Sequence, residues 1–101
     1  MSRKITQQAV QSFLDRKSFS VSNTRVETDE LSTSLFLFNN KIAIFTVAGT
    51  ILVSLGGHPF TRTTQERLNG IPGIRVGKKD GQVLLNGLKW NGEFIAVKIN
   101  Q

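Results

Sequence analysis

The chain of 101 residues contains no cysteine, 39% hydrophobic residues and 20% charged residues, and it carries a net charge of +6. This length and composition predict one globular domain over residues 1–101 and exclude compositional disorder, disulfides, cysteine-ligated zinc, iron–sulfur clusters and a thiol nucleophile. Polar residues interrupt every apolar stretch, so we expect no signal peptide, no membrane-spanning segment and an intracellular location.

The first predicted element is a helix from about Gln7 to Arg16, where apolar residues recur at helical spacing. Thr6 is expected to cap this helix, because a threonine hydroxyl accepts a hydrogen bond from a free amide of the first turn. Strands are then expected over 24–28, 32–38, 41–46 and 51–55. The turns between them are expected at Asp29-Glu30, at Asn39-Asn40 and near Ala48-Gly49.

The second half of the chain predicts a short helix followed by more strands. Thr63 and Glu66 have the spacing of a capping box, so we expect a helix over about 64–69 that ends at Asn69-Gly70 before Pro72. Short strands are expected over 74–78, 83–85, 88–90 and 94–99. They are separated by Asp80-Gly81, Asn86-Gly87 and Asn91-Gly92, which are hairpin turn sequences.

This order of elements predicts an α+β fold. An N-terminal helix packs on a curved antiparallel sheet of about six or seven strands, with a second short helix. The side chains expected in the core are Phe13, Leu14, Leu35, Leu37, Ile42, Ile44, Leu68, Val83, Leu85, Ile95 and Val97.

The sequence lacks the parts of a self-contained catalytic, metal or cofactor site. The lone histidine, His58, follows Gly56-Gly57 and could pair with Ser54, but no nucleophile-elbow or phosphate-loop pattern surrounds them. The carboxylates Glu27 and Asp29-Glu30 are typical of a solvated acidic turn. We therefore expect a protein that is not an enzyme and needs no cofactor, unless it completes the site of another protein.

Basic residues in the second half suggest a binding surface for an acidic partner. A β-ribbon that carries lysines and one aromatic residue could lie along a phosphate backbone or stack on an unpaired base. The competing interpretation is that the lysines are only solvated, that the tryptophan belongs to the core, and that the charge keeps the protein soluble. The candidate binding residues are Arg62, Arg67, Arg75, Lys78, Lys79, Lys89 and Trp90.

Several stretches of the chain form a recognisable pattern: TTQERLN (63–69) with IPGI (71–74), LNGLKWNG (85–92), SNTRV (22–26) and LFLFNNKIA (35–43). Together they resemble a group of small proteins from tailed bacteriophages. In that group the hairpin often reads His-Gly where this chain has Asn39-Asn40. The similarity covers about Ala9 to Val97 and implies a phage origin and an accessory role in the host cytoplasm; it transfers no catalytic residues.

Two functions are consistent with these observations. The first is nucleic-acid binding through phosphate contacts by the basic residues. The alternative is a protein-binding inhibitor or adaptor that targets a host enzyme or defence complex, with an acidic host surface as partner and Trp90 with Phe60 as an aromatic anchor. A third possibility is a minor virion component that associates through strand edges.

Overall fold

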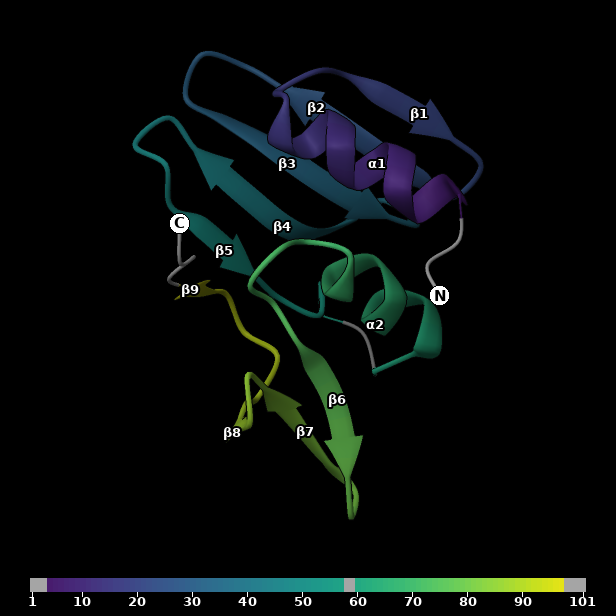
Figure 1. Ribbon diagram of the computed structural model, residues 1–101, viewed down its shortest axis with the longest axis vertical. Coiled ribbons are helices and arrows are strands. Elements are labelled where there is room, and N and C mark those ends of the chain that lie inside the picture. Colours follow the sequence, from purple (N-terminus) through teal and green to yellow (C-terminus); the bar gives the residue numbers. More distant parts are fainter. Residues whose placement is uncertain (1–3, 58–59, 98–101) are drawn as a thin grey trace.

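The computed structural model describes residues 4–57 and 60–97 and shows an α+β fold (Figure 1). Its helices are α1 (Lys4–Leu14) and α2 (Arg62–Asn69). Its strands are β1 (Phe19–Val21), β2 (Thr24–Thr28), β3 (Ser32–Leu37), β4 (Asn40–Thr46), β5 (Ile51–Val53), β6 (Val76–Lys79), β7 (Gln82–Leu85), β8 (Leu88–Lys89) and β9 (Ile95–Val97).

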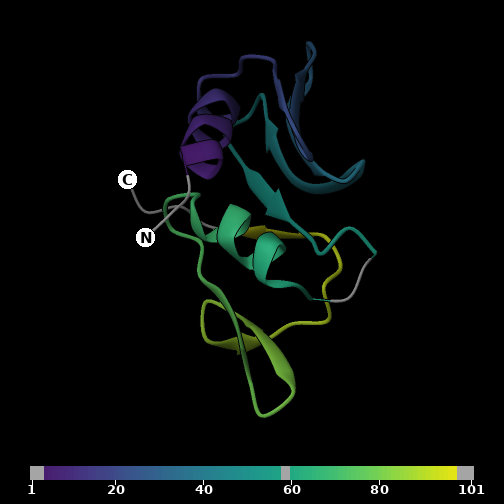
Figure 2. The same ribbon diagram turned by 90° about the vertical axis from the view of Figure 1, so that its right-hand side faces the viewer.

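The strands form two antiparallel sheets, where the sequence suggested one. The larger sheet has six strands in the order β1-β2-β3-β4-β5-β9, and the smaller has three in the order β6-β7-β8. Helix α1 lies against β1, β2 and β3, while α2 lies between the larger sheet and β6 (Figure 2). The expected α+β fold is confirmed, and the smaller sheet extends from the larger one as an arm (Figures 1 and 2).

Helix α1 begins earlier than the sequence suggests. Its first described residue is Lys4, so Thr6 lies inside the helix and is fully buried instead of capping it. The helix ends where Arg16 adopts a left-handed backbone with φ of 57° and places its guanidinium 3.8 Å from the ring centroid of Phe45. The expected cap is therefore wrong, because the hydroxyl of Thr6 serves an interior contact described below.

The hairpin between β3 and β4 turns one residue earlier than Asn39-Asn40. Phe38 and Asn39 occupy the turn with φ of 51° and 66°, and Leu37 pairs with Asn40. A β-bulge then follows, because Leu35 pairs with Ala43 whereas the next residue, Phe36, pairs with Lys41.

The bulge changes which side chains of β4 enter the core. Ile42 and Ala43 are both buried, although they are consecutive, and Ile44 is directed to the opposite face of the sheet. The placement of Ile44 in the core is therefore wrong, since strict alternation along β4 assumed no extra residue.

Helix α2 begins at a different cap from the one expected. Thr61 is the N-cap, and its hydroxyl accepts the backbone N–H of Thr64 at 3.1 Å. Glu66 instead accepts the hydroxyl of Thr6 at 2.9 Å. The predicted capping box of Thr63 and Glu66 is wrong, because this glutamate is directed towards α1.

The hairpin turns of the smaller sheet agree with the sequence. Asp80-Gly81 and Asn86-Gly87 all have positive φ, between 52° and 85°, as a two-residue turn between antiparallel strands requires.

The last predicted strand, over 94–99, is described only over β9, and residues 98–99 lie outside the described part of the chain. Ile95, on the edge strand β9, is 46% exposed, so its expected place in the core is wrong.

One hydrophobic cluster joins the two sheets and both helices. The expected core residues Phe13, Leu35, Leu37, Ile42, Leu68, Leu85 and Val97 belong to it, and Leu14 and Val83 pack against it partly buried. Trp90 also belongs to it, as the competing interpretation of the tryptophan expected. The members that the sequence did not single out are Ala9, Val10, Val26, Ala43, Ile51, Val53, Leu55, Ile71, Ile74 and Val76.

Candidate functional site

Three of the predicted basic side chains share the outer face of the smaller sheet. Side chains alternate along β6, so Lys79 lies on the same face as Gly77 and Arg75, the residue just before Val76. Leu84 pairs with Gly77, and Lys89 pairs with Leu84, which places Lys89 on this face as well. All three cations are exposed.

The sheet fixes the spacing of these cations. At a rise of about 3.3 Å per residue, the Cα atoms of Arg75 and Lys79 lie about 13 Å apart. The Cα atom of Lys89 lies about 10 Å from that of Gly77, across two strand spacings. Gly77 stands between them, and an added Cβ there would meet nothing within 4 Å. We call Arg75, Lys79 and Lys89 the cationic face; the only acidic residue between 74 and 90 is Asp80 at the hairpin turn.

Two other predicted cations are exposed but lie elsewhere. Lys78 alternates to the opposite face of β6, on the side of Val76 and Val83, and extends beyond the core near the hairpin turn. Arg62 is the first residue of α2, where the helix dipole disfavours a cation. The fold therefore gathers only part of the predicted set on one surface.

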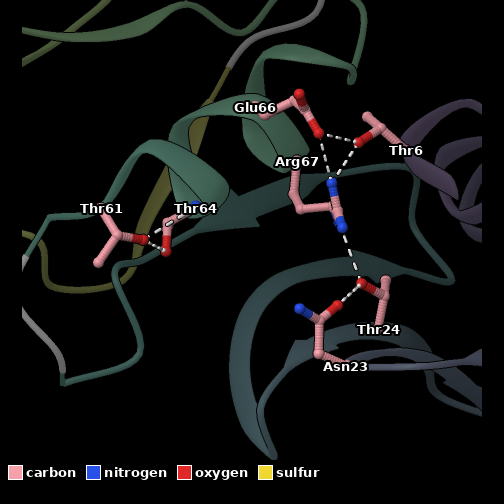
Figure 3. A network of polar contacts seen from close by, with 7 residues as sticks. All are labelled: Thr6, Asn23, Thr24, Thr61, Thr64, Glu66 and Arg67. Atoms are coloured by element: carbon pink, nitrogen blue, oxygen red, sulfur yellow. Dashed lines mark hydrogen bonds and ion pairs between the residues drawn. The ribbon is translucent and has the colours of Figure 1, made fainter. Parts of the chain in front are cut away.

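Arg67 is the centre of a buried polar network and not part of any basic surface. It is 1% exposed. Its Nε donates to Oγ1 of Thr24 at 3.0 Å, and its Nη1 donates to Oγ1 of Thr6 and to Oε1 of Glu66, the latter at 2.6 Å (Figure 3). The assignment of Arg67 to a binding site is corrected, because its charge is neutralised inside the protein where α1, α2 and β2 meet.

The network continues to the surface through Thr24. Its hydroxyl accepts from Arg67 and donates to Oδ1 of Asn23 at 2.8 Å. Figure 3 shows the amide nitrogen of Asn23 turned away from Thr24. A buried ion pair therefore fixes the orientation of a surface amide.

Trp90 belongs to the core. It is 6% exposed, and its indole Nε1 donates to the carbonyl oxygen of Glu93 at 2.9 Å. Phe60 is also partly buried against the same cluster. The interpretation of the tryptophan as a core residue is therefore confirmed, and Trp90 is not the exposed anchor that the alternative function suggested.

The glycine-containing loop after β5 is a turn with its polar atoms engaged. Gly56 and Gly57 have φ of 72° and 80°. Oγ of Ser54 donates to the carbonyl of Lys41 and accepts the N–H of Gly56, both at 3.0 Å. His58, the candidate base, lies outside the described residues. A pocket of about 520 Å³ lies beside this loop, lined by Ser54–Gly57 and Asn91–Phe94.

The acidic turn between β2 and β3 is stabilised by hydrogen bonds from backbone N–H groups to the carboxylate of Asp29. Oδ1 of Asp29 accepts the N–H groups of Leu31 at 2.8 Å and Ser32 at 3.0 Å. These two bonds lower the pKa of the Asp29 carboxyl below its usual 3.8. Residues 4–57 and 60–97 contain no group of three or more histidine or acidic side chains arranged to hold a metal ion.

The sequence analysis did not predict a group of aromatic and basic side chains that lies around Phe36 in the larger sheet. Phe36 lies under two cations: the guanidinium carbon of Arg25 is 4.4 Å, and Nζ of Lys41 is 5.6 Å, from its ring centroid. Phe38, in the adjacent turn, is 64% exposed. The available signal was two aromatic residues, Phe36 and Phe38, shortly before Lys41, but only the pairing of β2 with β3 brings Arg25 beside Phe36.

Comparison with known proteins supplies the origin of the chain. Residues 2–100 match the family described as Kyanoviridae Gp96 protein. The chain belongs to the Kyanoviridae Gp96 protein family. It is therefore a small protein of a tailed bacteriophage, which confirms the origin that the sequence resemblance implied. No curated protein and no solved structure matches it.

One structural finding concerns the membrane. Across the ranges 4–57 and 60–97, neither helix of this Kyanoviridae Gp96 family member is long and apolar enough to span a bilayer.

Proposed function

We propose that this Kyanoviridae Gp96 family member is a non-enzymatic phage accessory protein that binds nucleic acid in the host cytoplasm through its cationic face. The observation that supports the proposal is the gathering of Arg75, Lys79 and Lys89 on one exposed surface of the smaller sheet. Contacts of this kind position a protein on the phosphate backbone without reading sequence. No cofactor is needed for such binding.

The shape of the face suits a phosphate backbone. Gly77 and Leu84 form its centre and neither carries charge, so a chain of phosphates can approach the strands closely while the three cations surround it. Each phosphate that a cation neutralises releases a condensed counterion, so affinity should fall steeply with salt.

The test is the double change Lys79→Glu with Lys89→Glu, measured by fluorescence anisotropy with labelled DNA at several salt concentrations. We expect affinity to fall more than tenfold and the dependence of log K on log[salt] to lose about two units, roughly one per lost phosphate contact. The matched control is Lys4→Glu with Lys17→Glu, which changes net charge equally at exposed positions outside the smaller sheet.

The control pair should retain most of the affinity. An equal loss in both pairs would show that total charge matters and not this face. Unchanged binding in the Lys79 and Lys89 variant would show that the cationic face is not the nucleic-acid site.

A second candidate function is that of a protein-binding inhibitor or adaptor, and an exposed apolar pair favours it. Leu31 and Val47 are 75% and 70% exposed, and the N–H of Val47 donates to the carbonyl of Leu31 at 3.0 Å, so the two stand together. The test is Leu31→Ser with Val47→Ser in an affinity capture from nuclease-treated host lysate. Loss of one specific host protein, with folding retained, is the expected result; an unchanged catch would contradict this function.

A further inference from the structure

The turn between β3 and β4 has an unfavourable residue at its first position. Phe38 has φ of 51°, a backbone region that bulky side chains rarely adopt, and its ring is 64% exposed. An asparagine would suit this position better, and the chain has asparagine at each of the next two positions. The fold thus holds an aromatic ring in solvent at a cost in backbone strain, a combination that is characteristic of functional positions.

A pocket of about 500 Å³ lies beside this ring, between two hairpin turns. It is lined by Ser20, Ser22, Asn23, Arg25, Phe38 and Asn39. The N–H of Phe38 donates to the carbonyl of Asn23 at 2.9 Å, which joins the β3–β4 turn to the β1–β2 turn. The two turns that carry the lining of the pocket are therefore held together at their backbones.

The pocket presents hydrogen-bond donors. Oδ1 of Asn39 accepts from Nη1 of Arg25 at 2.8 Å, and Oδ1 of Asn23 accepts from Thr24. Both amide NH₂ groups are thereby left to face other partners, and within residues 4–57 and 60–97 neither forms a hydrogen bond. The buried Arg67 holds Thr24 in place, so the orientation of Asn23 is set from inside the protein.

The net charge of the pocket is small. Nε of Arg25 lies 2.6 Å from Oε2 of Glu27 as an ion pair without an aligned hydrogen bond. This carboxylate offsets the guanidinium, so a phosphate has little advantage here over a neutral group. An aromatic wall with amide and hydroxyl donors fits a flat ring that carries carbonyl oxygens.

We infer that this pocket takes an unpaired nucleobase of a single-stranded nucleic acid, which stacks on Phe38 and accepts hydrogen bonds from the amides of Asn23 and Asn39. The inference rests on the proposed function, since it names the form of nucleic acid that the protein binds. Stacking on an aromatic ring is tolerant of base identity, because every base has a π-face. Single strands are therefore preferred over duplexes, whose bases are already stacked.

The test is Phe38→Asn, measured by anisotropy with a labelled oligothymidylate of about twelve nucleotides, a length within the usual site sizes. We expect the affinity for this probe to fall between about fivefold and a hundredfold, as the loss of one stacking contact predicts. The melting temperature should stay unchanged or rise, because asparagine tolerates the left-handed backbone better than phenylalanine. Affinity for duplex DNA should not change, and Phe38→Trp should retain binding to the oligothymidylate.

The control change is Leu88→Asn, which removes a similarly exposed apolar side chain on the opposite face of β8 from Lys89. It should leave the affinity for oligothymidylate unaltered. If Phe38→Asn binds the oligothymidylate like the unaltered protein, while the Lys79 and Lys89 variant is weakened, the inference is wrong and the proposed function stands. If neither variant changes binding, both are wrong. An abasic oligonucleotide that the unaltered protein binds as tightly as oligothymidylate would also overturn the inference.

Discussion

At the scale of single residues, Arg67 is a fully buried cation that forms hydrogen bonds with three other side chains. A buried guanidinium is costly unless all its donors and its charge are matched. Here Glu66 supplies the opposite charge, while Thr6 and Thr24 supply hydroxyl oxygens from elements 61 and 43 residues away in sequence. The arginine therefore connects α1, α2 and β2, and its removal would take one donor from each threonine hydroxyl and the opposite charge from beside the Glu66 carboxylate.

We predict that Arg67→Ala lowers the free energy of unfolding by about 2–4 kcal/mol, because a buried pair is broken and packing is lost. Urea denaturation monitored by circular dichroism measures this. Arg62→Ala, an exposed arginine of the same helix, should change stability by less than about 0.5 kcal/mol. Equal effects of the two substitutions would show that the network contributes little to stability.

Single residues also show where sequence patterns fail. Thr63 and Glu66 have capping-box spacing, and Arg67 looks like a surface cation of a short helix. Yet Thr61 caps the helix instead. The side chain of Glu66 contacts Thr6 of α1, and that of Arg67 contacts Thr24 of β2. A threonine hydroxyl can cap a helix or accept from a buried arginine equally well. The local sequence does not contain the partner that decides between these roles.

At the scale of elements, the turn between β2 and β3 depends on an ionised carboxylate. The two backbone N–H groups that lower the pKa of Asp29 favour its charged form in the folded state. A carboxyl whose pKa is lower in the folded than in the unfolded chain stabilises the fold above its usual pKa. This stabilisation is lost as the pH falls through the lowered value.

We predict that Asp29→Asn is less stable than the unaltered protein at neutral pH, and that the difference disappears as the pH falls below the usual aspartate range. The asparagine oxygen can still accept both N–H groups, but it carries no charge to strengthen them. Thermal unfolding of the two proteins across pH 2–7 measures the difference. A gap that stays constant with pH would contradict a contribution from the charge.

The hairpin turns are predicted correctly from the sequence where the local backbone preference of two residues determines them. Asp80-Gly81 and Asn86-Gly87 are placed correctly because both residues of each pair accept positive φ, so the turn is determined locally. The turn predicted at Asn39-Asn40 moves to Phe38-Asn39 because β4 contains a bulge. That bulge directs Ala43 and Phe45 towards the core, where Phe45 lies 5.9 Å from Phe13 between ring centroids. Packing thus outweighs local turn preference.

At the scale of the whole molecule, the fold decides which charges act together. The seven predicted site residues separate into a cationic face, two isolated cations and two buried side chains. Lys78 and Lys79 are adjacent in sequence but lie on opposite faces of β6, whereas Lys89 joins Lys79 from two strands away. No spacing rule along the chain distinguishes these cases without the strand register.

The sequence by itself determined the α+β composition, the meander, the two Asx-Gly hairpin turns and the phage origin, because these depend on local backbone preference, hydrophobic periodicity and family resemblance. The tertiary structure alone decided the division into two sheets, the bulge in β4, the burial of Arg67, the choice between a core and a surface role for Trp90, and the neighbours of Phe38. Each of these depends on contacts between residues far apart in the chain, and the free energy of such contacts is larger than the local preferences they override.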